Sequence, residues 1–139
     1  MKLKSIMKTE VVTVDMDMPL RSISRMFKEK KFHHVVVVED DDICGIISEW
    51  DVLRASSPFL DTPSEQNRDL ATLRKRAHQI MSRHPVTITA DADAEDAVGI
   101  ILNKQISCLP VVSTDGELVG IVTWKDLLKA YSEQACAAV

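Results

Sequence analysis

The stretch Gly-Ile-Ile-Ser-Glu-Trp-Asp at residues 45–51 recurs as Gly-Ile-Val-Thr-Trp-Lys-Asp at residues 120–126. The similarity extends toward the N-terminus, where residues 6–7 match residues 80–81 and residues 12–14 match residues 86–88. Two copies of one pattern within a chain of 139 residues indicate a tandem duplication. Each copy alone has too few apolar residues for a stable core, so we expect the two copies to pack on each other.

Both copies show the same order of secondary structure. A β-branched run at residues 11–14 precedes Pro19, which suits the first turn of a helix. Apolar residues then recur at helical spacing, at Leu20, Ile23, Met26 and Phe27 and, in the second copy, at Ala94, Ala97, Val98, Ile101 and Leu102. Two apolar runs of strand length follow, 35–38 and 43–47 in the first copy and 109–112 and 118–122 in the second. Ser48 and Thr123 then begin a further helix, which we expect to end at about Tyr131 in the second copy.

The sequence therefore predicts an α/β (α+β) fold of two β-α-β-β-α repeats, packed sheet to sheet about a pseudo-twofold axis. We place the first repeat at residues 1–55, a linker at 56–79 and the second repeat at 80–139. The first half of the linker is rich in serine, proline and aspartate, which predicts a mobile loop. Apolar residues at helical spacing predict a helix in its second half, namely Leu70, Leu73, Ala77 and Ile80.

Composition excludes several classes of partner. Seventeen lysines and arginines against twenty-one aspartates and glutamates give a net charge of −4, and the basic residues are scattered, so we expect no nucleic-acid partner. The longest aliphatic run, residues 35–38, is far shorter than the roughly 20 residues that span a bilayer. Residues 1–10 show no apolar core of a secretory signal, and the three cysteines suit reduced thiols. We expect a cytoplasmic protein with no membrane partner.

The repeated signature places a glycine, a hydroxyl residue and an aspartate where a strand runs into a helix. Glycine allows close approach of backbone or ligand, and the start of a helix favours an anion such as phosphate. Asp51 and Asp126 follow the hydroxyl residue by one helical turn, where a carboxylate can accept hydrogen bonds from the two hydroxyls of a ribose. A phosphate site beside a ribose site indicates a nucleotide.

The same residues also fit a purely structural pattern. Ser48-x-x-Asp51 and Thr123-x-x-Asp126 match the capping box, in which the two side chains only satisfy backbone donors at the start of a helix. Two copies, each after a strand that begins with glycine, favour a nucleotide more than one copy would, but duplication also preserves caps. The residues leave both interpretations open.

The chain resembles a pair of CBS domains, the arrangement called a Bateman module. The resemblance rests on residues 6–7, 12–14, 35–38, 45–53, 80–81, 85–88, 107–112 and 120–128. In similar modules the cleft between the repeats binds AMP, ADP or ATP, and sometimes S-adenosylmethionine. The resemblance implies that Gly45, Ser48 and Asp51 hold phosphate and ribose in one cleft, and that Gly120, Thr123 and Asp126 do so in the other.

The resemblance also implies an apolar pocket for the base in each cleft. The set expected opposite Thr123 is Met7, Val12, Phe32, His33 and His34. The mirrored set expected opposite Ser48 is Met81, Val86, Ile106, Ser107 and Cys108. Val36 stands where the second copy has Pro110, and the two histidines stand where it has Ser107 and Cys108, so we expect two clefts that are not equivalent.

The sequence contains no nucleophile and base set, no zinc-ligand spacing and no phosphate-transfer loop, so we expect neither an enzyme, a catalytic cofactor nor a metal site. Adjacent residues of a strand point to opposite faces, so His33 and His34 do not readily share one metal. We expect an adenine-nucleotide sensor that acts in trans on an unidentified target protein. Similar modules often form disc-shaped dimers, which implies a homodimer.

Two alternatives to the sensor remain. In the first, the chain is a dimerisation or interaction scaffold that binds no ligand, and its hydroxyl and carboxylate residues serve only as helix caps. In the second, His33, His34 and the cysteines form a metal or redox sensor.

Overall fold

The computed structural model describes residues 1–137, and the chain divides into two compact units. Unit 1 comprises residues 1–11 together with the chain from Val86 onward. Unit 2 comprises residues 12–85. Each unit has its own sheet and its own hydrophobic core.

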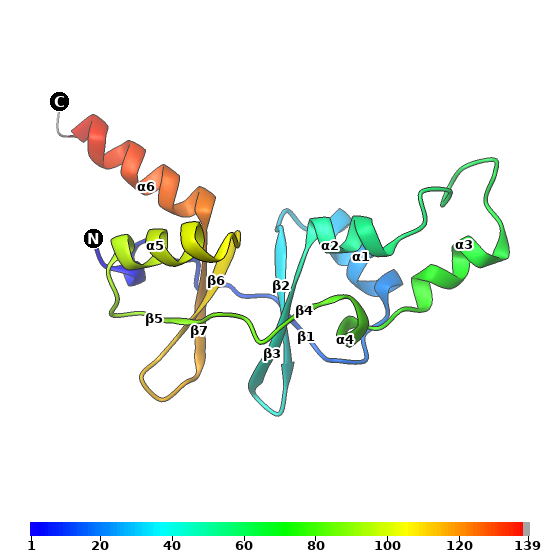
Figure 1. Cartoon of the computed structure of the whole chain (residues 1–139), viewed down its shortest axis with the longest axis horizontal. Coiled ribbons are helices and arrows are strands. Elements are labelled where there is room, and N and C mark those ends of the chain that lie inside the picture. The colour runs from blue at the N-terminus through cyan, green and yellow to red at the C-terminus, as the bar shows by residue number, and fades with distance from the viewer. Residues whose placement is uncertain (138–139) are drawn as a thin grey trace. The chain divides into compact units, whose positions relative to one another are not determined.

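Unit 2 is built on a four-stranded sheet in the order β1-β2-β3-β4 (Figure 1). The strands are β1 (Thr13–Val14), β2 (His34–Glu39), β3 (Asp42–Ser48) and β4 (Ser82–Arg83). β1 is parallel to β2, and the other neighbouring pairs are antiparallel. The helical segments are α1 (Leu20–Glu29), α2 (Glu49–Ala55), α3 (Asn67–Ala71), the 3₁₀ turn η2 (Thr72–Arg74) and α4 (Ala77–Ile80).

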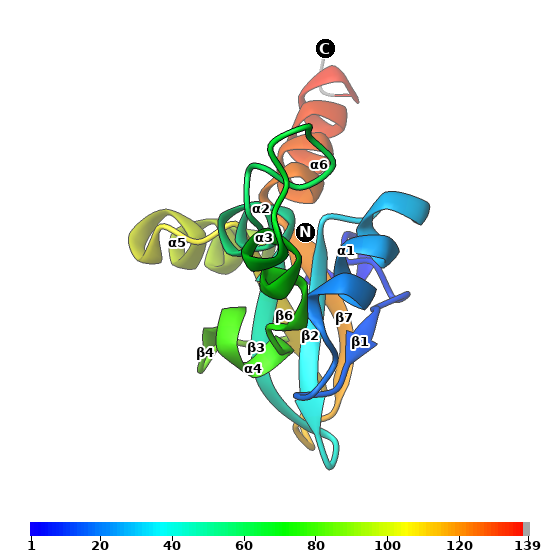
Figure 2. The ribbon, with the colours of Figure 1, turned by 90° about the vertical axis from the view of Figure 1, so that its right-hand side faces the viewer.

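The core of unit 2 forms between α1 and the sheet. Val35 and Val37 are alternate residues of β2 and therefore share one face, and both are fully buried. Leu20 and Ile23, one helical turn apart on α1, are fully buried in the same cluster. Figure 2 shows α1 beside β1 and β2. The helical spacing and the apolar strand predicted from the sequence are confirmed here.

Unit 1 repeats this plan with a three-stranded sheet in the order β5-β6-β7. The strands are β5 (Ile88–Thr89), β6 (Cys108–Val112) and β7 (Leu118–Thr123). The helical segments are the 3₁₀ turn η1 (Leu3–Ser5), α5 (Ala94–Lys104) and α6 (Trp124–Ala137). Leu3, Ala97, Leu109 and Val122 are fully buried in its core. The α/β fold of two similar repeats is confirmed, and α6 continues past the expected end at Tyr131.

Each unit combines the body of one repeat with the segment that leads into the other repeat. In unit 1 the N–H of Leu3 donates to the carbonyl of Ala92 at 3.0 Å, and Lys8 exchanges backbone hydrogen bonds with Ile121 at 2.9 Å. In unit 2 the N–H of Ala77 donates in the same way to the carbonyl of Met18 at 2.9 Å. We call residues 1–8 and 75–83 the leading segments.

The second half of the linker differs from the single helix that the sequence predicts. The backbone is extended at Lys75 and Arg76, so α3 with η2 is separated from α4. The carbonyl of Lys75 accepts a hydrogen bond from the N–H of Leu20 at 2.7 Å. In a continuous helix this carbonyl would accept from a residue four positions later, so the bond to Leu20 takes the place of a helical bond. Residues 57–65 form hydrogen-bonded turns. Among residues 1–137, no helix is both long and apolar enough to cross a bilayer.

Candidate ligand-binding site

Ser48 and Asp51 form a complete capping box at the start of α2. The Ser48 hydroxyl accepts a hydrogen bond from the Asp51 N–H at 3.1 Å. The Ser48 N–H and hydroxyl both donate to Oδ2 of Asp51, at 2.8 and 3.0 Å. These bonds hold the carboxylate in one orientation.

Thr123 and Asp126 repeat this geometry at the start of α6. The Thr123 N–H and hydroxyl donate to Oδ2 of Asp126 at 2.9 and 3.0 Å, and the Asp126 N–H donates to the hydroxyl at 3.2 Å. The capping role foreseen for these residues is therefore present in both repeats. Because Oδ2 is occupied by the cap, Oδ1 is the oxygen that each aspartate can offer to a ligand.

Each Oδ1 lies beside a cation. Nη2 of Arg54 lies 2.6 Å from Oδ1 of Asp51, and Nζ of Lys8 lies 3.6 Å from Oδ1 of Asp126. The aspartate side chains are only 9% and 13% exposed, whereas those of Arg54 and Lys8 are 62% and 64% exposed. A carboxylate oxygen has two lone pairs, so each Oδ1 can accept a further hydrogen bond beside its cation.

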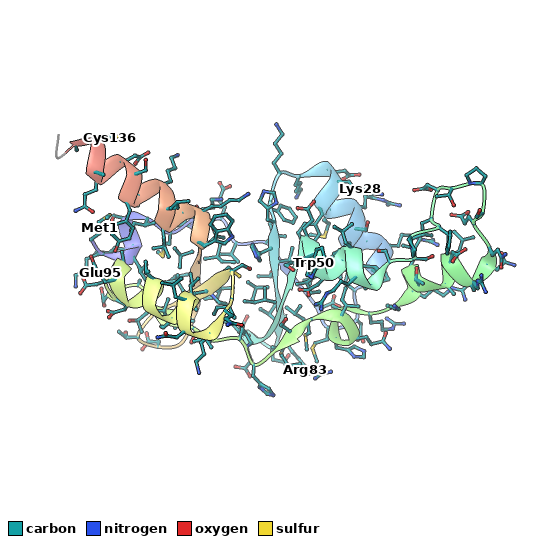
Figure 3. The ribbon with its side chains drawn as sticks, turned by 45° about the horizontal axis from the view of Figure 1, so that its top comes forward. Met1, Lys28, Trp50, Arg83, Glu95 and Cys136 are labelled. Atoms are coloured by element: carbon teal, nitrogen blue, oxygen red, sulfur yellow. The ribbon has the colours of Figure 1, made fainter. Side chains whose placement is uncertain are left out.

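An open pocket lies next to each of these aspartates, within its own unit. The pocket in unit 2 has a volume of about 330 Å³ and is lined by Asp51, Arg54, Ala55, Lys75, Gln79 and Ile80. The pocket in unit 1 has a volume of about 370 Å³ and is lined by Met1, Ser5, Ile6, Lys8, Asp126, Lys129, Ala130 and Glu133. Met1, which belongs to this second lining, is labelled in Figure 3. Both volumes lie at the lower end of the range of small-molecule sites, about 300–1,000 Å³.

The two pockets occupy equivalent places in the two repeats. Asp51, Arg54 and Ala55 correspond to Asp126, Lys129 and Ala130, three residues on one face of the second helix of each repeat. The remaining residues shared by the two pockets come from the leading segments, where Lys75, Gln79 and Ile80 correspond to Met1, Ser5 and Ile6. Each pocket is therefore formed between a leading segment and the helix that carries the aspartate.

The two signature glycines contact protein backbone. A Cβ atom at Gly45 would lie 2.8 Å from the carbonyl oxygen of Ser82, and one at Gly120 would lie 2.8 Å from that of Lys8. Real Cβ atoms do not approach so closely. The glycines thus allow the leading segments to pack on β3 and β7, which accounts for their position without a ligand.

The residues expected around the base lie elsewhere in the two units. Val12, Phe32 and Met81 pack against the core of unit 2, and Met7, Val86 and Ile106 pack against the core of unit 1. None of the ten expected residues lines either of the two pockets. The apolar lining is Ala55 and Ile80 in unit 2, and Met1, Ile6 and Ala130 in unit 1. Their role in binding a base stays a prediction.

The four polar residues of these sets lie next to the hydroxyl residue of their own repeat. His34 is paired with Ser48 across β2 and β3, and Cys108 is paired with Thr123 across β6 and β7. The carbonyl of Ser107 accepts a hydrogen bond from the N–H of Trp124 at 3.0 Å.

The imidazole of His33 contacts the carboxylate of Glu49. Its Nδ1 lies 3.0 Å from Oε2 of Glu49. Within the described part of the chain, no group of three His, Cys, Asp or Glu residues is placed to hold a metal ion.

A comparison with known families matches the model of the CBS domain at residues 3–58 and again at residues 77–133. The chain belongs to the CBS domain family. The two matches cover both copies of the duplicated sequence, so the chain contains a pair of CBS domains.

Similar proteins support this assignment. A CBS domain-containing protein of Dictyostelium discoideum is 31% identical over 127 residues, which cover 90% of this chain and 87% of that protein. A CBS domain pair solved in complex with 5′-methylthioadenosine and S-adenosyl-L-methionine has a TM-score of 0.79 at 22% identity, with 96% of this chain and 98% of that chain covered. CBSX2, solved in complex with AMP, has a TM-score of 0.76 at 23% identity, with 96% and 98% covered.

The site residues expected from the sequence do not include the cations of the two CBS pockets. Arg54 and Lys129 each lie three residues after the signature aspartate, and this spacing on a helix brings two side chains together, so the sequence did contain a signal for them. Lys8 and Lys75 lie far from the aspartates in the sequence, and only the packing of the leading segments brings them to the pockets. Each unit thus presents an oriented carboxylate oxygen, cationic side chains and a small apolar surface in one open pocket.

Proposed function

We propose that this CBS domain pair is a regulatory module that binds an adenosine compound, such as AMP, ADP, ATP or S-adenosylmethionine, and acts in trans on another protein. One observation carries the proposal. In each repeat an aspartate is fixed by its helix cap, so that one oxygen is occupied and the other borders an open pocket beside a cation. In this proposal the chain acts in the cytoplasm, as a binding protein and not as an enzyme.

The ribose is the part of the ligand that the aspartates recognise. A ribose has two neighbouring hydroxyls, both of which can donate to a carboxylate. The ligands named in the similar solved structures are AMP, S-adenosyl-L-methionine and 5′-methylthioadenosine, which have the adenosine ribose in common. Oδ1 of Asp51 and Oδ1 of Asp126 supply the acceptors, and the capping bonds hold them ready for the ligand.

A phosphate on the ligand is held by side chains. The N–H groups of Ser48 and Asp51 bond within the cap, and the N–H of Glu49 donates to the carbonyl of His33. A hydroxyl has one proton, which Ser48 gives to Asp51. Arg54 and Lys75 border the pocket of unit 2 and are the side-chain donors to phosphate there, a role for which a guanidinium and an ammonium are well suited.

Binding acts on the fold through the leading segments. In unit 2 the pocket lies between α2 and a segment that contributes Lys75, Gln79 and Ile80 and then continues into the second repeat. A ligand that bridges these two parts favours the conformation in which they lie together. A partner protein that distinguishes this conformation from others then responds to the ligand.

A second candidate function, the ligand-free scaffold, has its own supporting observation. Large apolar side chains are exposed on α2, where Trp50 and Leu53 are 65% and 63% exposed, and on α6, where Leu128 is 61% exposed. Figure 3 marks Trp50 on α2. Such side chains suit contact with another protein surface. We infer that α2 and α6 contact a second copy of the chain, so that the module is a homodimer whether or not it binds a ligand.

A thermal-shift titration with AMP, ADP, ATP, S-adenosylmethionine and GTP tests the proposed function. A ligand that binds only the folded state raises its stability by about 2.7 kcal/mol at a concentration of 100 times Kd. We expect a concentration-dependent rise in Tm with at least one adenosine compound, and a loss of that rise when Asp51→Ala and Asp126→Ala are combined. No shift with any adenosine compound at millimolar concentration would instead favour the scaffold.

A further inference from the structure

We propose that Gln79 recognises the base of the ligand in unit 2, and that this pocket selects adenine over a 6-oxopurine such as hypoxanthine. The inference rests on the proposed function, because it assumes that Asp51 binds the ribose of a nucleotide. It goes further by naming the residue that selects the base and by assigning this selectivity to one of the two pockets.

The base lies at the Gln79 end of the pocket of unit 2. The two cations of the lining hold the phosphate, and Nζ of one of them, Lys75, donates to the carbonyl of Ala55 at 2.8 Å. In a nucleotide the ribose lies between the phosphate and the base. With the ribose on Asp51, the base therefore reaches the part of the lining that remains, which consists of Gln79 and Ile80. Ile80 is partly buried and offers an apolar surface to the flat face of a purine.

A hydrogen bond fixes the orientation of the Gln79 side chain. Its Oε1 accepts from the N–H of Arg76 at 2.8 Å, at the start of α4. In a side-chain amide only the oxygen accepts and only the nitrogen donates. A half-turn of the amide would set Nε2 against the N–H of Arg76, so the bond opposes any exchange of the two atoms. Nε2, with its two N–H donors, is therefore the atom that Gln79 holds ready for a ligand.

This orientation suits adenine and disfavours a 6-oxopurine. On its Watson–Crick edge adenine has an acceptor at N1, whereas hypoxanthine has an N1–H donor at the same place. Nε2 of Gln79 donates to N1 of adenine but meets another donor at N1 of hypoxanthine. A glutamine that is free to turn would accept from that N1–H through Oε1, but here the turn costs the bond to Arg76.

The pocket of unit 1 has a serine at the equivalent position, Ser5. Its hydroxyl donates to the carbonyl of Lys2 at 2.7 Å, which leaves the lone pairs of the oxygen as acceptors for a ligand. A hydroxyl also turns about a single bond and can give its proton to a ligand instead. Ser5 therefore suits both N1 of adenine and N1–H of hypoxanthine, and we expect the pocket of unit 1 to bind the two bases alike.

Isothermal titration calorimetry with AMP and IMP tests the inference, because these nucleotides have the same ribose and phosphate and differ only in the base. Full-length Asp126→Ala keeps the pocket of unit 2, and full-length Asp51→Ala keeps that of unit 1; thermal denaturation verifies that each variant folds. We expect Asp126→Ala to bind AMP at least about tenfold more tightly than IMP, since IMP leaves two donors opposed. We expect Asp51→Ala to bind the two nucleotides within about threefold of each other.

Exchange of the two equivalent residues provides the matched control. Gln79→Ser in the Asp126→Ala background should bring the affinities for AMP and IMP to within about threefold, and Ser5→Gln in the Asp51→Ala background should create a preference for AMP. Gln79→Glu keeps an acceptor for the N–H of Arg76 but replaces the donor by a second acceptor. In the Asp126→Ala background it should leave Tm unchanged and reverse the preference in favour of IMP. Its negative charge weakens both nucleotides equally and so does not alter their ratio.

The outcomes separate this inference from the proposed function. Equal ratios of AMP to IMP affinity in the two single-pocket variants, with clear binding, would overturn the inference and leave the proposed function intact. An AMP preference that survives Gln79→Ser would do the same, because another group would then select the base. An absence of binding of both nucleotides to the unmodified chain would overturn both.

Discussion

The sulfur of Met81 lies over the backbone of Gly45, where a Cβ atom would stand 2.5 Å from it. Met7 and Gly120 repeat this relationship in the other unit, with a corresponding distance of 2.7 Å. Each pair joins a leading segment to the strand that ends at the hydroxyl residue of the signature. The glycine of the signature thus maintains the packing that builds one wall of the pocket.

Substitution of Gly45 by alanine tests this role. Because the nearest backbone atom, the carbonyl oxygen of Ser82, is part of the paired strand β4, the clash is not relieved by a rotamer change alone. We expect Gly45→Ala to lower the free energy of unfolding by about 1–3 kcal/mol in urea denaturation. Gly99→Ala is the control, because Gly99 lies within α5 with open space around it, and there alanine should add about 0.5–1 kcal/mol. A similar effect at both positions would contradict the packing role.

The duplicated pattern predicted most of the fold because its signals are local. Apolar spacing identified α1 and α5, and the hydroxyl residue before the aspartate marked where α2 and α6 begin. The interruption at Lys75 and Arg76 could not be predicted in this way. It depends on backbone bonds to Met18 and Leu20, more than fifty residues earlier in the chain.

The candidate site could be predicted to the same extent. Asp51 and Asp126 became candidates because the carboxylate and its hydroxyl partner lie within one helical turn. Lys8 could not be assigned to Asp126, because the sequence does not say that residues 1–8 pack against the body of the second repeat. Six of the ten residues expected near the base are apolar, and an apolar residue fits a core as well as a pocket. Val12 and Met7 pack against the cores of their units.

Removal of the Ser48 hydroxyl should affect stability and ligand affinity together. The hydroxyl accepts from the Asp51 N–H and donates to its carboxylate, so Ser48→Ala removes two of the three capping bonds and holds the carboxylate less firmly. We expect a loss of about 1 kcal/mol in urea denaturation and weaker binding of AMP by calorimetry. Ser48→Thr is the matched control, since threonine stands at the equivalent Thr123, and it should retain both properties. Loss of stability with unchanged affinity would show that the cap does not orient the ligand-binding oxygen.

Asp69 should make stability depend on pH in the acid range. The Ser57 hydroxyl, which donates to Asp69 at 2.7 Å, and the Gln66 N–H hold the pKa of this carboxyl below its ordinary value of 3.8. The folded state therefore favours the carboxylate, and its contribution is complete above the pKa of the unfolded chain, about 3.9, and is lost as the pH falls through the lowered pKa. Chemical denaturation between pH 7 and pH 2 should show that the stability difference between the wild type and Asp69→Asn shrinks as the pH falls. A difference that stays constant over this range would contradict the assignment, and Ser57→Ala should act in the same direction as Asp69→Asn.

The exposed apolar residues of α2 should determine the oligomeric state. Trp50 and Leu53 lie one helical turn apart, so a lysine at both positions places charge on the face that we expect to contact a second copy. In sedimentation equilibrium the wild type should have twice the mass of its 15.5 kDa chain, and the double variant Trp50→Lys, Leu53→Lys should approach the single-chain mass. Lys28→Glu on α1 changes an exposed charge on a helix outside the proposed interface and should leave the dimer intact. A wild type that sediments as a monomer would exclude the dimer.

The claim that the two aspartates recognise a ribose is tested most directly by changing the ligand and leaving the protein unmodified. Calorimetric titration of the wild type with AMP and with 2′,3′-dideoxy-AMP compares two ligands that differ only in the ribose hydroxyls. Because each lost hydrogen bond to a charged group costs about 1.5–3 kcal/mol, we expect the dideoxy compound to bind at least tenfold more weakly. Equal affinity for the two compounds would contradict the account, since the carboxylates that the caps orient would then play no part in recognition.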